Sequence, residues 1–189
     1  MNVIYGVYND GTKDVYVPFK VDSEGKGLIA GLTVVGAASF TRPADTTAYS
    51  IGDLVANSTS PASVVALSIP VTRVNAGSCI IRKIQLYKSS NTLTGANFRI
   101  HLFNTVPVMS VGDNAQIILP QIQNYIGRCD ITLDQAFSNG AWGSSDITFS
   151  DEHVNLPSGK NIYALIEVRS AYTPTSAEVF TLSLEVIQD

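Results

Sequence analysis

The chain has 189 residues, a net charge of −4 and a pI near 5.1, and only 15% of its residues are charged. This length fits one domain with an appendage, and the acidic balance lacks the basic surface that binding to nucleic acid requires. No apolar run of about 18 residues occurs, which argues against a membrane span, and the N-terminus lacks the regions of a secretory signal. We therefore expect assembly in a cytoplasm.

Residues 1–35 predict a β-hairpin arm. The segments NVIYGVY and DVYVPFKV flank Asn9-Asp10-Gly11, which is a strong hairpin signal. Pro18 has no N–H to give to a ladder, so its strand should lie at an edge. A two-stranded hairpin is marginal alone in water, so its apolar side chains should find a partner. The side chains expected at that interface are Tyr5, Val7, Val15, Val17 and Phe19.

The body, residues 36–189, is dominated by an alternation of apolar and polar residues. The segments VFTLSLEV, FRIHLF and IYALIEVR all show this period of two. Such alternation is typical of strands with one buried face. In the segment IIRKIQLYK, the pattern places Ile80, Ile84 and Leu86 inward, with Arg82 as the exception.

Helical signals are weak along the whole chain. The best candidate is LPQIQNYIG, residues 119–127, which can give one or two turns opened by Pro120 and closed by Gly127. Turn signals such as Asn139-Gly140 recur at short intervals. Many short strands without crossover helices predict an all-β protein, an antiparallel β-sandwich.

The segment FTRPADTTAYSIGDLV, residues 40–55, is interpreted as a fixed connection between strands. The carboxylate of Asp45 can accept the backbone N–H two residues further on, which makes a turn. Arg42 and Asp45 are close enough in sequence to form an ion pair, which at an exposed position contributes at most about 1 kcal/mol.

The residue types that carry chemistry are few. His101 and His153 are the two histidines, and both are interpreted as solvated or structural, because no G-x-S-x-G motif or reactive cysteine accompanies them. Asp146, Asp151, Glu152 and His153 form a small acidic cluster that does not match the ligand spacing of a calcium loop. The sequence therefore predicts no enzyme, no metal site and no cofactor.

Cys79 and Cys129 are the two cysteines, and both lie within strand-like segments. A reducing compartment argues against a disulfide between them. We therefore expect two buried thiols.

Aromatic residues leave one alternative open. Trp142 lies in the glycine-rich segment NGAWGSS, and together with several tyrosines it can form a platform on which sugars stack, although a single tryptophan is more often a hydrophobic plug. The tyrosines considered for this platform are Tyr49, Tyr87, Tyr125 and Tyr172.

Three stretches carry a resemblance to a known family. Residues 40–55, residues 98–117 (FRIHLFNTVPVMSVGDNAQI) and residues 162–186 (IYALIEVRSAYTPTSAEVFTLSLEV) resemble, in the same order, a family of structural proteins of tailed-bacteriophage virions. These proteins are small β-sandwiches and often decorate the capsid. The resemblance implies a body of jelly-roll type.

The resemblance also implies a function. It points to a capsid decoration or cement protein that binds the outside of the phage head and stabilises contacts between capsomers of the major capsid protein. Such proteins tend to form homotrimers, and no catalytic residue carries over from the family. The alternative is a carbohydrate- or receptor-binding module of a phage tail or head fibre.

Overall fold

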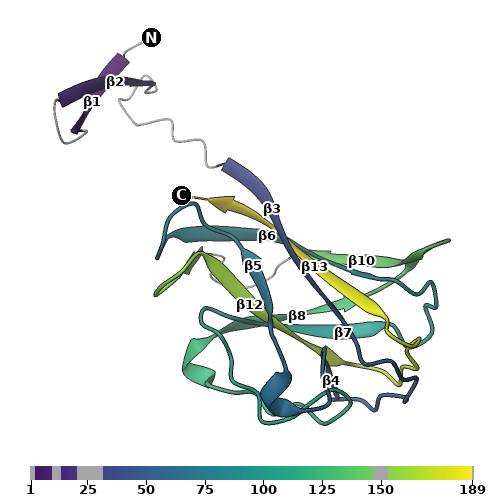
Figure 1. Ribbon diagram of the computed structural model, residues 1–189. Coiled ribbons are helices and arrows are strands. Elements are labelled where there is room, and N and C mark those ends of the chain that lie inside the picture. Colours follow the sequence, from purple (N-terminus) through teal and green to yellow (C-terminus); the bar gives the residue numbers. More distant parts are fainter. Residues whose placement is uncertain (1–2, 10–13, 21–31, 147–152, 189) are drawn as a thin grey trace. The chain divides into compact units, whose positions relative to one another are not determined.

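The computed structural model describes residues 3–9, 14–20, 32–146 and 153–188 (Figure 1). The chain divides into two compact units, Met1–Gly31 and Leu32–Asp189. The division falls before residue 35, the expected boundary, because residues 32–35 already belong to the first strand of the body.

The N-terminal unit is a hairpin of β1 (Val3–Asn9) and β2 (Asp14–Lys20). The two strands pair antiparallel without interruption, in agreement with the hairpin signal at Asn9-Asp10-Gly11. Pro18 pairs with Tyr5 in this ladder. The interface expected here involves side chains that lie outside the described part of the structure, so it stays a prediction for Tyr5, Val7, Val15, Val17 and Phe19.

The described body contains strands and two short 3-10 turns, and no α-helix. The strands are β3 (Leu32–Thr41), β4 (Leu54–Val55), β5 (Leu67–Pro70), β6 (Ser78–Lys88), β7 (Asn97–Phe103), β8 (Tyr125–Thr132), β9 (Gln135–Phe137), β10 (Gly140–Asp146), β11 (His153–Asn155), β12 (Asn161–Val168) and β13 (Val179–Gln188). The 3-10 turns are η1 (Pro61–Ser63) and η2 (Ile122–Asn124).

The strand order is that of a jelly roll. One sheet has the order β3-β13-β6-β10-β9, with β11 also paired to β6, and the other has the order β4-β12-β7-β8, with β5 also paired to β12. Because the first and last strands of the body are neighbours, and the chain crosses between the sheets from β3 to β4, from β5 to β6, from β6 to β7, from β8 to β9, from β11 to β12 and from β12 to β13, it wraps as two interlocked Greek keys. This order confirms the all-β sandwich and its jelly-roll type.

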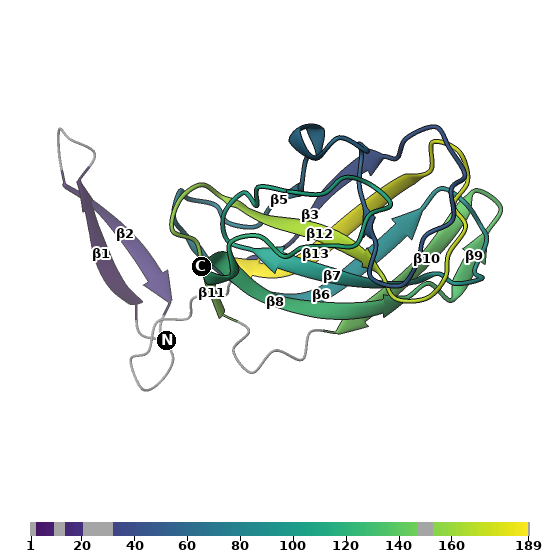
Figure 2. The same ribbon diagram turned by 90° about the horizontal axis from the view of Figure 1, so that it is seen from below.

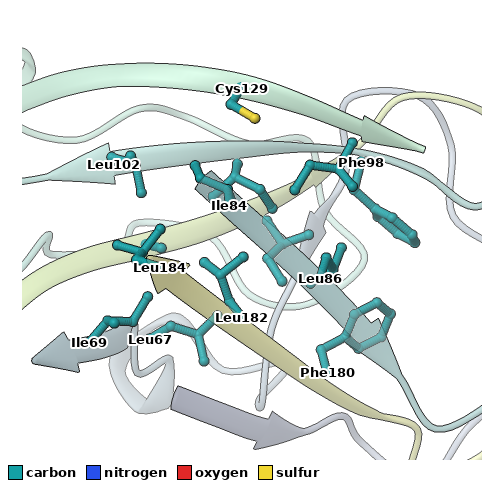
Figure 3. Close-up of a cluster of buried hydrophobic side chains, with 14 of the residues drawn as sticks. Leu67, Ile69, Ile84, Leu86, Phe98, Leu102, Cys129, Phe180, Leu182 and Leu184 are labelled. Carbon is teal, nitrogen blue, oxygen red and sulfur yellow. The ribbon is translucent and has the colours of Figure 1, made fainter. Parts of the chain in front are cut away.

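The core lies between the two sheets. Along β13 every second side chain is buried, as the alternation of VFTLSLEV predicts. These side chains meet partners from β5, β6, β7 and β8 (Figure 3). The labelled members of the core are Leu67, Ile69, Ile84, Leu86, Phe98, Leu102, Cys129, Phe180, Leu182 and Leu184.

A bulge changes which residues of β6 point inward. The ladder between β13 and β6 shifts register after Glu185, which pairs with Lys83, so that Val186 pairs with Ile81. Arg82 is the extra residue, and such an insertion changes the alternation of faces. Ile81 is therefore buried, and the placement of Ile80 inward was wrong.

Loops cover the outer face of the sheet that contains β12 and β7. A second apolar cluster forms there, with Leu165 of β12 and Phe103 of β7 buried beneath Met109. The helix expected over residues 119–127 is mostly wrong. In this segment the chain forms one 3-10 turn, η2, and Ile126 already belongs to β8.

Candidate functional site

The three stretches that carry the family resemblance meet in one buried polar cluster. We define the polar cluster as Arg42, Tyr49, Lys88, Asp113, Tyr172 and Glu178. Each of these six side chains is at least nine-tenths buried. All of them except Lys88 come from residues 40–55, 98–117 or 162–186.

Asp113 is the acceptor at the centre of one half of the cluster. Its carboxylate lies 2.9 Å from Nη2 of Arg42 and accepts hydrogen bonds from the Tyr49 hydroxyl at 2.6 Å and the Ala56 N–H at 2.7 Å. The Tyr49 hydroxyl also accepts a hydrogen bond from Nε of Arg42. The Asp113 carboxylate thus connects the loop after β3, which carries Arg42 and Tyr49, to Ala56, the first residue after β4.

Glu178 holds the other half. One of its oxygens lies 3.2 Å from Nζ of Lys88, and the other accepts a hydrogen bond from the hydroxyl of Tyr172. Lys88 also donates to the carbonyl of Ser90 at 2.9 Å. Lys88 occupies an inward position of β6 and is fully buried, so its ammonium group depends on these partners for the interactions lost with water.

Two stacked tyrosine rings join the halves. The ring centroids of Tyr49 and Tyr172 are 6.2 Å apart, and the N–H of Tyr49 donates to the carbonyl of Tyr172 at 2.8 Å. The Arg42 guanidinium lies 4.7 Å from the centre of the Tyr49 ring, and the Lys88 ammonium lies 5.2 Å from that of Tyr172. The cluster is therefore continuous from the Arg42–Asp113 ion pair to the Lys88–Glu178 ion pair.

The electrostatics of the cluster favour structure over chemistry. Burial raises the pKa of Tyr49 and of Tyr172 well above the usual range, and the adjacent carboxylates add to the effect. Burial alone would lower the pKa of Arg42, but its interactions with Tyr49 and Asp113 raise it overall. Both tyrosines stay neutral at physiological pH and Arg42 stays charged, so none of the three exchanges a proton.

The Arg42–Asp45 ion pair forms, but it is not the exposed pair expected from the sequence. The side chain of Arg42 is fully buried and its main partner is Asp113, because the loop carrying Asp113 folds over it. Asp45 lies 3.6 Å away with 37% of its side chain exposed. The predicted turn is confirmed, since Asp45 accepts the N–H of Thr47 at 2.9 Å.

His101 and Glu167 form a separate buried pair on the outer face of the sheet that contains β7 and β12. His101 lies opposite to Ile100 and Leu102, as the alternation predicts, but it is only 3% exposed. Its Nε2 lies 2.7 Å from the carboxylate of Glu167, and its Nδ1 lies 3.0 Å from the hydroxyl of Tyr125. The structural interpretation of His101 is therefore supported and the solvated one was wrong.

The acidic cluster is only partly described. Asp146 is exposed at the end of β10, and His153 begins β11. Asp151 and Glu152 lie outside the described residues. Within the described part of the chain, no group of three His, Cys, Asp or Glu side chains is arranged to hold a metal ion.

The aromatic platform does not form as a set of five residues. Tyr49 and Tyr172 are in the polar cluster, and Tyr125 packs against Phe103 on the outer face of the other sheet. Trp142 lies in β10 and not in a loop, and it pairs directly with Tyr87 of β6. Two of the five candidates are therefore neighbours on one sheet face.

Both cysteines are buried, and no disulfide joins Cys79 to Cys129. Burial raises the pKa of the Cys129 thiol, which lowers its reactivity. These positions agree with the expectation of two buried thiols in the core.

The helical segments in the described part of the chain are all too short to cross a membrane. No protein-family profile matches the chain, and a comparison with curated protein sequences finds no match. Among solved structures, the chain is similar to one described as "Structure of Triatoma Virus (TrV)", with 10% sequence identity and a TM-score of 0.26. The similarity covers 83% of this chain and 64% of that chain's length. At this TM-score it carries no argument, and the jelly-roll assignment rests on the strand order.

Proposed function

We propose that this chain is a decoration protein of a tailed-bacteriophage capsid. It would bind the outside of the head and stabilise contacts between capsomers of the major capsid protein, as an adhesive protein without catalysis. The observation that carries the proposal is the resemblance of residues 40–55, 98–117 and 162–186, which supply most of the polar cluster. The resemblance thus falls on the residues that hold the body together, and the strand order agrees with it.

Self-association is part of the proposal, as a homotrimer. Within the described strands, β3 pairs only with β13. Residues 32–41, LTVVGAASFT, carry neither a charge nor a proline, and their ladder with β13 has no register shift. A long, uncharged, regular edge strand is a ready template for pairing with another chain.

The other edges of the sandwich are protected. β9 has three residues, β5 has four and ends in Pro70, and β8 carries Arg128 and Asp130 and shifts register against β7. Short strands, proline, charges and bulges are the usual devices that prevent pairing. The contrast supports β3 as the edge that contacts a neighbouring copy.

A hollow beside β3 adds to this surface. It has a volume of about 320 Å³ and lies against Ala38, Ser39 and Phe40. Its other wall is formed by Asn57 and by residues 65–68. A side chain of an incoming strand would fit there, as in other cases where a strand is added to a sheet edge.

The N-terminal hairpin is proposed as an arm that contacts the capsid or a neighbouring copy through Tyr5, Val7, Val15, Val17 and Phe19. Two strands are too few to be stable alone in water, which supports a partner for this unit. Deleting residues 1–30 should leave the body folded and weaken attachment to heads. Wild-type occupancy of heads by the truncated protein would contradict the arm.

Electron microscopy of virions labelled with antibody against this chain tests the location. We expect the label to be distributed over the exterior of the head. Label confined to the tail or to fibres would contradict it and favour the receptor-binding alternative.

A further inference from the structure

The outer face of the sheet that contains β6 and β10 differs from that of the opposite sheet. On the opposite sheet, Leu165 and Phe103 are buried under loops. Here the outward side chains of the central strands, such as Tyr87 and Trp142, are half-buried, and that of Val35 on the edge strand β3 is 62% exposed. Among the described residues of the body, the second cluster of buried apolar side chains belongs to the opposite sheet and not to this face. The outward side chains of β6 and β10 are therefore partly accessible to a ligand.

Three aromatic residues lie together at one end of this face. We define the aromatic strip as Tyr87 of β6, Trp142 of β10 and Phe137 of β9. Trp142 pairs with Tyr87 on one side and with Gln135 on the other. Phe137 lies two residues from Gln135 and so on the same face, and it is 52% exposed. β9 and β10 lie side by side at this end of the sandwich (Figure 2).

The backbone fixes the orientation of the Tyr87 ring. A Cβ atom added to Gly140 would come within 2.4 Å of Oη and 2.5 Å of Cε2 of Tyr87. The Tyr87 hydroxyl also donates to the carbonyl of Asn139 at 2.6 Å. One face of the Tyr87 ring therefore lies against the backbone of Gly140, and the hydrogen bond of its hydroxyl to Asn139 holds the ring in place. The other face of the ring is turned away from the sheet before any ligand binds.

The groups around the strip are mainly neutral hydrogen-bonding groups. Gln135 flanks Trp142, Thr181 pairs with Tyr87, and Ser144 pairs with Gln85 in the next row. Lys83, one row further along β6, has its ammonium 5.7 Å from the centre of the Trp142 ring. Two carboxylates lie at positions paired with Lys83, those of Asp146 and Glu185.

We propose that the aromatic strip binds a neutral glycan. The C–H bonds on one face of a pyranose ring stack on an aromatic ring, which carries negative charge on its face. Amide and hydroxyl groups such as those of Gln135 and Ser144 then bind the sugar hydroxyls. An acidic sugar is disfavoured, because Asp146 and Glu185 occupy the strand positions on either side of Lys83, the cation described beside the strip. This activity is independent of attachment to the capsid and would make the exposed face a second adhesive surface.

The full-length protein can be tested with the glycan itself as the probe. Trp142 is the sole tryptophan of the chain, so binding should change the tryptophan fluorescence. Neutral oligomers of glucose, mannose and N-acetylglucosamine would be titrated beside sialyllactose and hyaluronan as acidic counterparts. We expect saturable binding of at least one neutral oligomer and at least tenfold weaker binding of the acidic ones.

Variants assign the binding to the strip. Trp142→Ala and Phe137→Ala should each weaken binding at least fivefold by calorimetry. The side chain of Phe137 is half exposed, so Phe137→Ala should fold normally even where Trp142→Ala does not. Ile187→Ala, on the same face but at the other end of the interior strand β13, is the control and should bind like wild type. The proposal is overturned by no binding of any neutral oligomer, by equal binding of acidic sugars, or by an unaltered affinity in Phe137→Ala. Loss of head attachment in Phe137→Ala without any glycan binding would assign the face to the capsid and also overturn it.

Discussion

The stability of the body should depend strongly on Asp113. The substitution Asp113→Asn keeps an oxygen that can accept from Tyr49 and Ala56 but removes the charge opposite Arg42. Arg42 then remains buried and charged without its buried carboxylate partner, and the carboxylate left nearby is that of the partly exposed Asp45, 3.6 Å away. Breaking a buried ion pair in this way costs about 3–5 kcal/mol, which for a domain of this size lowers the melting temperature by roughly 6–20 °C.

The structure supplies a matched control. Arg99 and Asp130 also form an ion pair, with two hydrogen bonds of 2.6 and 2.8 Å. Their side chains are 14% and 58% exposed, so solvent screens the interaction. Asp130→Asn should therefore cost less than about 1 kcal/mol. The same chemical change thus gives a large effect at one site and a small effect at the other.

Urea denaturation followed by circular dichroism measures both variants, and a double substitution tests the mechanism. Arg42→Met combined with Asp113→Asn removes the stranded charge, so the double variant should be more stable than Asp113→Asn alone. Equal losses for Asp113→Asn and Asp130→Asn would refute the argument. So would a double variant whose loss equals the sum of the two single losses.

Three further predictions concern pH, oxidation and assembly. Burial lowers the pKa of His101 below its ordinary value of 6.5 despite the opposing effect of Glu167. The unfolded chain therefore binds the proton more readily than the folded one, and the free energy of unfolding should fall as the pH drops below about 6.5. The urea midpoint should decline from pH 8 to pH 5 in the wild type and stay level in His101→Gln. Alkylation should leave Cys79 and Cys129 unlabelled in the native protein and label both after denaturation, whereas a mass two protons lower without label would reveal a disulfide. In sedimentation, Ala37→Lys on the β3 edge should convert the proposed trimer to monomer. Ser183→Lys, at the position paired with Ala37 on the interior strand β13, should leave the trimer intact. A trimer in both variants would show that β3 is not the contact.

The strands of the body could be predicted from the sequence because the residues at buried positions are apolar and recur at every second position. The alternation in β13 needs no knowledge of the rest of the fold. The bulge at Arg82 was not predictable in the same way, because it appears only when β6 is aligned with β13. The inward position of Ile81 follows from that long-range pairing.

The polar cluster was beyond sequence reasoning for a similar reason. Arg42 and Asp113 are far apart in sequence, and the turn that carries Asp113 reads as an ordinary solvated loop. Lys88 gave the one local signal, since its spacing from Ile84 and Leu86 places a charged residue at an inward position. A buried lysine requires a carboxylate partner, but which carboxylate supplies it is decided by the jelly-roll topology.

The most direct test of a decoration function is to add the purified protein to phage heads that lack it. We predict saturable binding to the exterior of the heads, and a higher temperature at which the heads open and release their DNA. Heads that bind no protein, or that bind it and open at an unchanged temperature, would contradict the proposal that this chain cements the capsid.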